Sequence, residues 1–154
     1  MIAEIVVSSI PELLAAPNLQ EMMDAYAAEA ALEGMPEPKA NLDAYRAMDK
    51  WGLMHTLCAM VDGKIIGFIL VLVNELPHYS ALLASIESYF VLAQYRQSGA
   101  GIMLLKSAET HAFEKNAAGF MVSAACGGTL DKMMMRSMIY RKTHNVYFTG
   151  FHDA

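Results

Sequence analysis

Apolar residues recur along this chain with two different periods, and the two periods together predict a mixed α/β domain. Continuous or alternating apolar runs rich in β-branched residues are typical of strands, and helical spacing of apolar positions indicates helices. The runs typical of strands lie at residues 2–8, 55–61, 64–73, 83–92, 120–125 and 145–152. Helical spacing covers residues 11–34, with a break near Pro17, and then 41–52, 99–117 and 129–142. The predicted order is β-αα-βββ-α-β-α-β, a mixed central sheet of about six strands with four helices.

Short local motifs support this order at three places. Asp62 and Gly63 stand between two apolar runs and predict a tight β-hairpin. Asn41 precedes a helical segment and predicts an N-terminal cap. The segment 83–125 has the pattern strand, helix, strand, and a crossover of this kind joins parallel neighbouring strands.

Length and composition narrow the class of protein. A chain of 154 residues has the usual size of one domain, so we expect residues 1–154 to form a single domain. The formal net charge of -5 argues against nucleic-acid binding, which needs a basic surface. The longest apolar run, residues 65–73, is too short to cross a membrane, and the N-terminus has no signal-peptide pattern. We therefore expect a cytoplasmic protein without a membrane anchor.

Cysteines and histidines, which often build sites, give no such signal here. Cys58 and Cys126 are too few for a disulfide framework or a thiolate metal site. The five histidines lack a metal-ligand spacing such as His-x-x-x-His. We therefore expect no metal centre.

The junction between the strand at 83–92 and the helix at 99–117 has an unusual composition. It contains Arg96-Gln97-Ser98-Gly99-Ala100-Gly101. The first turn of a helix has backbone N–H groups without partners and a partial positive charge, and glycines let an anion approach the backbone. The junction therefore indicates a phosphate-binding turn, although a glycine-softened turn between strand and helix would have the same composition.

Two other phosphate-binding loops do not fit this junction. A Walker loop needs Gly-Lys-Ser/Thr, whereas Ile102 and Met103 follow Gly101. A dinucleotide-binding fingerprint needs a third glycine at the position of Leu104.

The same six residues resemble the Arg/Gln-x-x-Gly-x-Gly/Ala motif of the GNAT N-acetyltransferase superfamily. The surrounding stretch, IESYFVLAQYRQSGAGIMLL, is similar to strand 4 and helix 3 of that superfamily, and the predicted order of elements matches its fold over nearly the whole chain. The resemblance implies that backbone amides of the turn bind the pyrophosphate of acetyl-CoA, the cosubstrate, and that a backbone N–H at Val91 holds the thioester carbonyl. The implied cofactor-binding residues are Phe90, Val91, Arg96, Gln97, Ser98, Gly99, Ala100 and Gly101.

The resemblance also implies two catalytic side chains. Residues 86–91, IESYFV, are similar to a pattern whose glutamate acts as a base, often through water, which makes Glu87 the candidate base for the acceptor amine. Residues 138–142, MIYRK, resemble a segment whose tyrosine points at the CoA sulfur, which makes Tyr140 the candidate acid for the leaving thiolate. Strand alternation places Glu87, Tyr89 and Val91 on one face, unless a bulge breaks it. Because four strand residues span roughly 13 Å, Glu87 needs a water relay or an extended acceptor.

The chain departs from the family pattern near its C-terminal end. His144-Asn145 stands where Gly-Phe often follows the tyrosine, and Met133 replaces an asparagine that often contacts the pantetheine arm. Many relatives also carry one more strand than the sequence predicts here. This difference suggests an open sheet edge that a second copy could cover, and hence a homodimer.

The charge of one segment indicates the kind of acceptor. In the family, the first two helices and their connection shape the acceptor side, and residues 21–49 here contain seven acidic and two basic side chains. We therefore expect direct transfer, in a ternary complex, to a cationic primary amine, either a polyamine-like small molecule or a protein lysine. Two alternatives remain open. One is a non-catalytic acyl-CoA-binding or interaction module, and the other is a donor with a different acyl chain.

Overall fold

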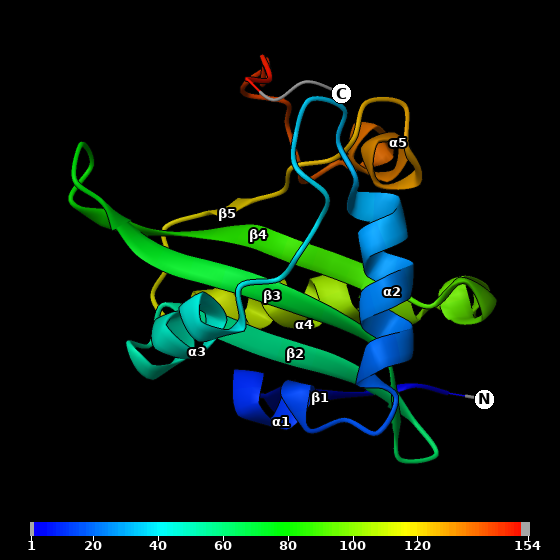
Figure 1. Cartoon of the computed structure of the whole chain (residues 1–154). Coiled ribbons are helices and arrows are strands. Elements are labelled where there is room, and N and C mark those ends of the chain that lie inside the picture. Colours follow the sequence, from blue (N-terminus) through cyan, green and yellow to red (C-terminus); the bar gives the residue numbers. More distant parts are fainter. Residues whose placement is uncertain (1, 152–154) are drawn as a thin grey trace.

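The computed structural model of the chain describes residues 2–151, and these form a mixed sheet flanked by helices (Figure 1). The elements are β1 (Glu4–Ser8), α1 (Ile10–Leu14), α2 (Leu19–Ala30), α3 (Leu42–Lys50), β2 (Met54–Val61), β3 (Lys64–Leu76), β4 (Ala81–Val91), the 3-10 helix η1 (Ala93–Ser98), α4 (Ala100–Glu114), β5 (Phe120–Met121) and α5 (Thr129–Arg136). The strand order is β1-β2-β3-β4-β5; β4 and β5 are parallel, and the other neighbours are antiparallel. The structure thus confirms the mixed α/β fold and the predicted crossover, with five strands where about six were expected.

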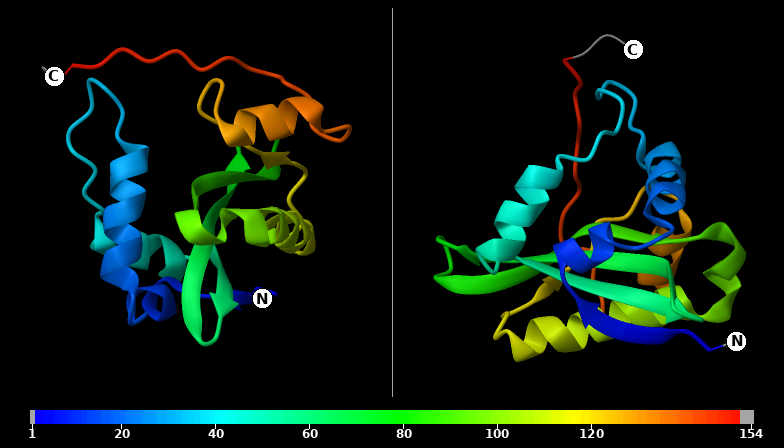
Figure 2. Two further views of the ribbon diagram at one scale, coloured as in Figure 1. Left: turned by 90° about the vertical axis from the view of Figure 1, so that its right-hand side faces the viewer. Right: turned by 60° about the horizontal axis from the view of Figure 1, so that its bottom comes forward.

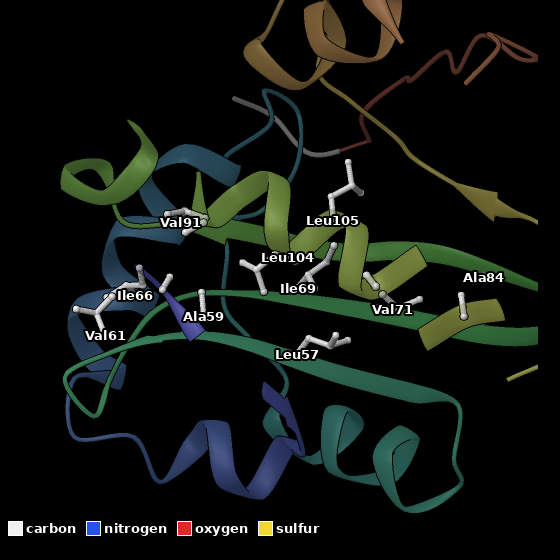
Figure 3. Close-up of a cluster of buried hydrophobic side chains, with 14 of the residues drawn as sticks. Leu57, Ala59, Val61, Ile66, Ile69, Val71, Ala84, Val91, Leu104 and Leu105 are labelled. Carbon is white, nitrogen blue, oxygen red and sulfur yellow. The ribbon is translucent and has the colours of Figure 1, made fainter. Parts of the chain in front are cut away.

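Helices cover both faces of the sheet. Helices α1, α2 and α3 lie on one face and α4 lies on the other (Figures 1 and 2). The buried cluster on the α4 face includes Val91 of β4 with Leu104 and Leu105 of α4 (Figure 3). A second cluster, on the α2 face, includes Met22 and Phe90. Consecutive residues Phe90 and Val91 therefore anchor β4 to both halves of the core, as strand alternation requires.

The local motifs form as the sequence predicts. Asp62 and Gly63 both have positive φ angles, +48° and +74°, which a two-residue hairpin turn between twisted strands requires. The side chain of Asn41 accepts a hydrogen bond from the backbone N–H of Ala44 at 3.1 Å and caps α3. The helical structure is also interrupted between α1 and α2, near Pro17, as the sequence predicts.

Strands β4 and β5 pair over a short distance only. Their register contains two pairs, Ala84 with Phe120 and Ser85 with Met121. The remainder of β4, as far as Val91, has no neighbour from β5. The sheet therefore opens along this edge of β4, which is the edge that leads to the glycine-containing turn.

The C-terminal part differs from the prediction. Helix α5 ends at Arg136 and not near residue 142, and β5 ends at Met121 and not at residue 125. The strand predicted at 145–152 does not form within 145–151, and His152 lies outside the described residues. A strand needs a partner for its backbone groups, and none of residues 145–151 makes a backbone–backbone hydrogen bond with the rest of the described chain. The segment instead runs as an extended tail from α5 toward the connection between α2 and α3 (Figure 2).

Candidate active site

The turn after β4 has the geometry of an anion-binding site. Strand β4 ends at Val91, η1 follows, and Gly99 reverses the chain with φ +85° before α4 begins at Ala100. A φ in this range favours glycine, because a Cβ would crowd the backbone. A Cβ built on Gly99 would meet nothing within 4 Å, so the space in front of the turn is open.

The first turn of α4 presents free backbone donors to that space. The N–H of Ala100 donates to Ser98 Oγ at 3.3 Å, and this hydroxyl donates to the Tyr95 carbonyl at 2.7 Å. Within residues 2–151 we find no acceptor for the N–H groups of Gly101 and Ile102. Two amides at the positive end of a 15-residue helix are thus available to an anion.

Gly101 has a different role from Gly99. A Cβ at Gly101 would lie 2.8 Å from the hydroxyl of Tyr89, inside the protein and not in the open space. Burial raises the pKa of Tyr89 to about 12, so this hydroxyl stays protonated. Gly101 is small because the first turn of α4 lies directly on Tyr89.

Val91 directs its backbone N–H to the open edge of β4. In an antiparallel ladder, alternate residues exchange backbone hydrogen bonds with the partner strand. The N–H of Leu92 donates to the Ile66 carbonyl on β3 at 2.9 Å, so the N–H and carbonyl of the preceding Val91 point away from β3. Because β5 does not pair with this part of β4, the Val91 amide is free to hold a carbonyl oxygen.

The Arg96 side chain contacts protein groups on three sides. Its Nε donates to the Val91 carbonyl at 2.9 Å, and one terminal nitrogen forms an ion pair with Glu29 of α2. The guanidinium carbon lies 5.5 Å from the centroid of the Phe90 ring. Arg96 thus links α2 to the end of β4 and leaves its other N–H donors for a ligand.

A β-bulge determines the direction of Glu87. Leu70 pairs with Ser88 and Val71 pairs with Ile86, so Glu87 has no partner on β3. The extra residue interrupts the alternation. Glu87 therefore does not share a face with Tyr89 and Val91, as uninterrupted alternation predicts, but contacts helix α3 on the opposite face.

Hydroxyl groups surround the Glu87 carboxylate. Tyr45 of α3 donates to Oε1 at 2.8 Å, and Ser88 donates to Oε2. Ser88 in turn accepts a hydrogen bond from Tyr26 of α2 at 3.1 Å. Burial, followed by the hydrogen bond to Glu87, raises the pKa of Tyr45 far above its ordinary value, so the phenol remains a donor.

Tyr140 lies beyond the end of α5, and its hydroxyl donates to Glu109 of α4. Burial is the main cause that raises the pKa of Tyr140 far above its ordinary value, and the bond to Glu109 adds to it. Glu87 contacts a helix on one face of the sheet and Tyr140 a helix on the other.

The candidate residues fall into three groups. Val91, Arg96 and the turn from Ser98 to Gly101 lie together at the end of β4, and Gln97 is exposed there. Glu87 lies on the α3 side, and Tyr140 on the α4 side. Tyr45 was not predicted from the sequence, because no local pattern links a helix residue to a strand residue 42 positions away.

Comparison with known proteins agrees with this geometry. The sequence profile of the Acetyltransferase (GNAT) family matches residues 19–129. The chain belongs to this family. The match confirms the family and the fold that the sequence predicts. GNAT proteins are acyltransferases that use acyl-CoA donors. A search of curated protein sequences found no match.

Solved structures with the same fold have diverse descriptions. A ribosomal-protein-alanine N-acetyltransferase from Brucella melitensis biovar Abortus 2308 is 14% identical, with a TM-score of 0.70, over 96% of this chain and 99% of that chain. An aminoglycoside acetyltransferase from an uncultured soil metagenomic sample, in complex with sisomicin, is 17% identical, with a TM-score of 0.70, over 96% of both chains. A transcriptional regulator from Bacillus halodurans C-125 is 16% identical, with a TM-score of 0.73, over 97% of this chain and 99% of that chain. At these identities the likeness establishes the GNAT fold.

Two further features of the described residues bear on function. No helix between residues 2 and 151 has the length and apolar character that a membrane crossing needs. Over the same residues, no group of three or more histidine, cysteine, aspartate or glutamate side chains is arranged to hold a metal ion.

Proposed function

We propose that this GNAT protein is an N-acetyltransferase that moves the acetyl group of acetyl-CoA to a cationic primary amine in a ternary complex. The proposal depends on one observation: free backbone N–H groups lie at both ends of the segment that joins β4 to α4. One is the Val91 amide at the open edge of β4, and the other is the first turn of α4 behind Gly99. A carrier bound by its diphosphate at the turn can direct its acyl end to Val91.

The residues at this place suit coenzyme A. The amides of Gly101 and Ile102 would hold the diphosphate, with the backbone of Ser98, Gly99 and Ala100 around it. The remaining donors of Arg96, and the exposed Gln97, would add contacts to the phosphates. Phe90 would act through its ring, which lies next to the Arg96 guanidinium, because its backbone faces β3. Bound acetyl-CoA would supply the thioester and its acetyl group.

Three groups of the chain would then assist the transfer. The Val91 N–H donates to the carbonyl oxygen as negative charge develops on it. Glu87 accepts, through water, the proton that the acceptor ammonium must lose before its nitrogen can attack. Tyr140 donates a proton to the departing thiolate after its hydroxyl leaves Glu109. Acceptor and carrier would approach from the two faces of the sheet and meet where β4 separates from β5.

Charge supports a cationic acceptor. Residues 21–49, which include α2 and α3, carry seven acidic and two basic side chains. The ion pairs found in the described part of the chain, Arg46 with Asp43 and Arg96 with Glu29, do not include Glu87. Its charge is therefore available to an ammonium group of a polyamine-like molecule or a protein lysine.

The experiment that tests the proposal combines binding with turnover. Isothermal titration calorimetry with acetyl-CoA should show one site, and release of free thiol should appear with a polyamine or a lysine peptide. No affinity for CoA would contradict the proposal. CoA binding without thiol release across polyamines, aminoglycosides and lysine peptides would favour the alternative, a non-catalytic acyl-CoA-binding module with the GNAT fold. Succinyl-CoA and propionyl-CoA in the same assay test the acyl preference.

The proposal includes a homodimer in the cytoplasm, with residues 1–154 as one domain. The outer edge of β5 is unpaired in the described chain, and the tail after α5 exposes side chains that suit a strand. Pairing of these two features between two copies would cover both. Cys58 and Cys126 are free thiols, which suits a reducing compartment.

A further inference from the structure

The carboxylate of Glu87 is held at both of its oxygens by side chains from different elements. Tyr45 reaches Oε1 from α3, and the neighbouring Ser88 reaches Oε2 from the strand itself. Such an arrangement leaves the carboxylate few orientations, because a rotation about its last bond would break both hydrogen bonds.

The bulge in β4 makes this arrangement possible. Without it, Glu87 and Ser88 would point to opposite faces of the sheet. With Glu87 inserted as the unpaired residue, both side chains face the helices α2 and α3. One local irregularity of the strand thus places the carboxylate and its first donor side by side.

The donor hydroxyls are themselves fixed. Ser88 is only 3% exposed, and its oxygen accepts the Tyr26 hydroxyl at 3.1 Å, so its single proton is directed to Glu87. Tyr45 stands on a helix that is tied to the N-terminal part of the fold, since the Asp49 carboxylate accepts the backbone N–H of Ile10 at 3.2 Å. Both donors are neutral, so they orient the carboxylate without cancelling its charge.

We propose that Tyr45 is a positioning residue of the active site, which, together with Ser88, fixes the Glu87 carboxylate toward the acceptor amine. This inference rests on the proposed role of Glu87 as the base. It adds a residue from α3 to the candidate residues of the strand, the turn and the C-terminal segment. It also explains why a base on an exposed strand position can have a defined direction.

The first experiment measures turnover in Tyr45→Phe, with Tyr79→Phe as the matched control. Both changes remove one phenol oxygen, but Tyr79 is 73% exposed in the turn between β3 and β4, away from the cluster. We expect Tyr45→Phe to lower kcat about tenfold, with KM for acetyl-CoA within about twofold of the wild type, and Tyr79→Phe to leave both unchanged. Ser88→Ala, which removes the donor at the other oxygen, should act in the same direction.

A double-mutant cycle separates positioning from a general structural effect. If Tyr45 acts through Glu87, then Tyr45→Phe should change kcat less than about twofold in the Glu87→Gln background. Losses that multiply in the double variant would overturn the inference, as would a wild-type kcat in Tyr45→Phe when Glu87→Gln is slow. Thermal unfolding of each variant shows whether the fold is retained.

A measurement that needs no turnover distinguishes failure of the inference from failure of the proposed function. The side-chain carboxyl carbon of Glu87 can be followed by NMR in protein labelled with carbon-13 glutamate, with Glu87→Gln to assign the signal. Tyr45→Phe should shift this signal, and Tyr79→Phe should not. If Tyr45→Phe shifts the signal but Glu87→Gln leaves the rate unchanged, the contact exists but Glu87 is not the base. That result would also overturn the positioning role of Tyr45. An unmoved signal would overturn the inference whatever the activity.

Discussion

The Cα of Gly101 faces the hydroxyl of Tyr89 so closely that a Cβ added at Gly101 would lie 2.8 Å from that oxygen. The next ring atom, Cζ, would be 3.8 Å away, which is an ordinary contact. The hydroxyl alone therefore sets the limit on the residue at position 101. This contact connects β4, which carries Val91, to the first turn of α4, where the diphosphate is proposed to bind.

Gly101→Ala should weaken binding of CoA, and Tyr89→Phe should restore it. The alanine must displace either the first turn of α4 or the Tyr89 ring, and the proposed donors move with that turn. We expect a loss of affinity of about tenfold in Gly101→Ala, which corresponds to about 1.4 kcal/mol. In the double variant the missing oxygen makes room for the methyl group, so affinity should recover to within about threefold of the wild type.

Calorimetry with CoA on the four proteins of this cycle checks the prediction. Tyr89→Phe alone is the matched control and should bind CoA as the wild type does. Equal affinity in Gly101→Ala and the wild type would show that the first turn of α4 does not carry the binding. If the affinity for CoA does not recover in the double variant, the alanine acts through a contact other than the one with Tyr89.

Tyr140→Phe should slow turnover without loss of CoA binding. The leaving thiolate loses its proton donor, and the expected decrease in kcat is about tenfold to a hundredfold. Steady-state kinetics with calorimetry separates the two effects. A wild-type rate in Tyr140→Phe would remove Tyr140 from the mechanism and leave it as a packing residue with Glu109 as its partner.

The pH profile gives an independent test of Tyr140. A general acid must be protonated, so activity is retained at high pH until the pH exceeds the pKa of the acid. Burial and the Glu109 carboxylate both raise the pKa of Tyr140. Glu109→Gln removes the charge, so the alkaline limb of the kcat/KM profile, which reports the free enzyme, should move to lower pH. An unchanged alkaline limb, or a shift to higher pH, would contradict the assignment.

Much of the fold follows from local patterns in the sequence. The Asp62-Gly63 hairpin and the Asn41 cap each depend on a few neighbouring residues, the crossover from β4 to β5 depends on the order of successive segments, and all form as predicted. The direction of Glu87 does not follow, because alternation alone cannot locate a bulge. The same holds for Tyr45, whose contact with Glu87 depends on how α3 packs on the sheet.

The end of the chain shows why a strand-like sequence is not sufficient for a strand. Residues 145–151 have aromatic and β-branched side chains, but the chain between 2 and 151 offers their backbone no partner. Helix α5 likewise ends at Arg136, and the capping residue Ser137 is already extended, with ψ 139°, and leads into this tail. Tertiary context, and not local propensity, decides both boundaries.

Stability should fall below neutral pH because of a histidine pair. His111 Nε2 and His55 Nδ1 lie 3.0 Å apart, between α4 and β2. Burial lowers the pKa of both histidines, and His111 and Lys115 lower the pKa of His55 further, against smaller opposite effects of a backbone hydrogen bond at Gly52 and of Asp49. Because the unfolded chain then binds more protons, the free energy of unfolding is fully retained above the ordinary histidine pKa, about 6.5, and decreases as the pH falls below it.

Urea unfolding at about pH 7.5 and about pH 5.5 measures this loss. His111→Gln removes one titrating ring and the repulsion between two charged rings, so the difference between the two pH values should be smaller than in the wild type. His78→Asn is the control, because His78 is exposed in a loop and should keep the wild-type difference. An equal pH dependence in wild type and His111→Gln would show that the pair does not control acid stability.

The tail after α5 should determine the oligomeric state. Val146, Tyr147 and Phe151 are 87%, 88% and 92% exposed, which is unusual for three apolar or aromatic side chains within six residues. Strand β5 is at the edge of the sheet, with its outer backbone groups unpaired in the described chain.

If the tail of one copy pairs with this edge of another, the protein should be a dimer by light scattering during size exclusion. Val146→Pro should make it a monomer, because proline removes a backbone donor and disfavours a strand. Val146→Thr, which keeps a β-branched side chain, should remain dimeric. Because the tail contributes little to the core of a single copy, both variants should keep the secondary structure of the wild type. A monomeric wild type would contradict the dimer itself, and a dimeric Val146→Pro would place the interface on another surface.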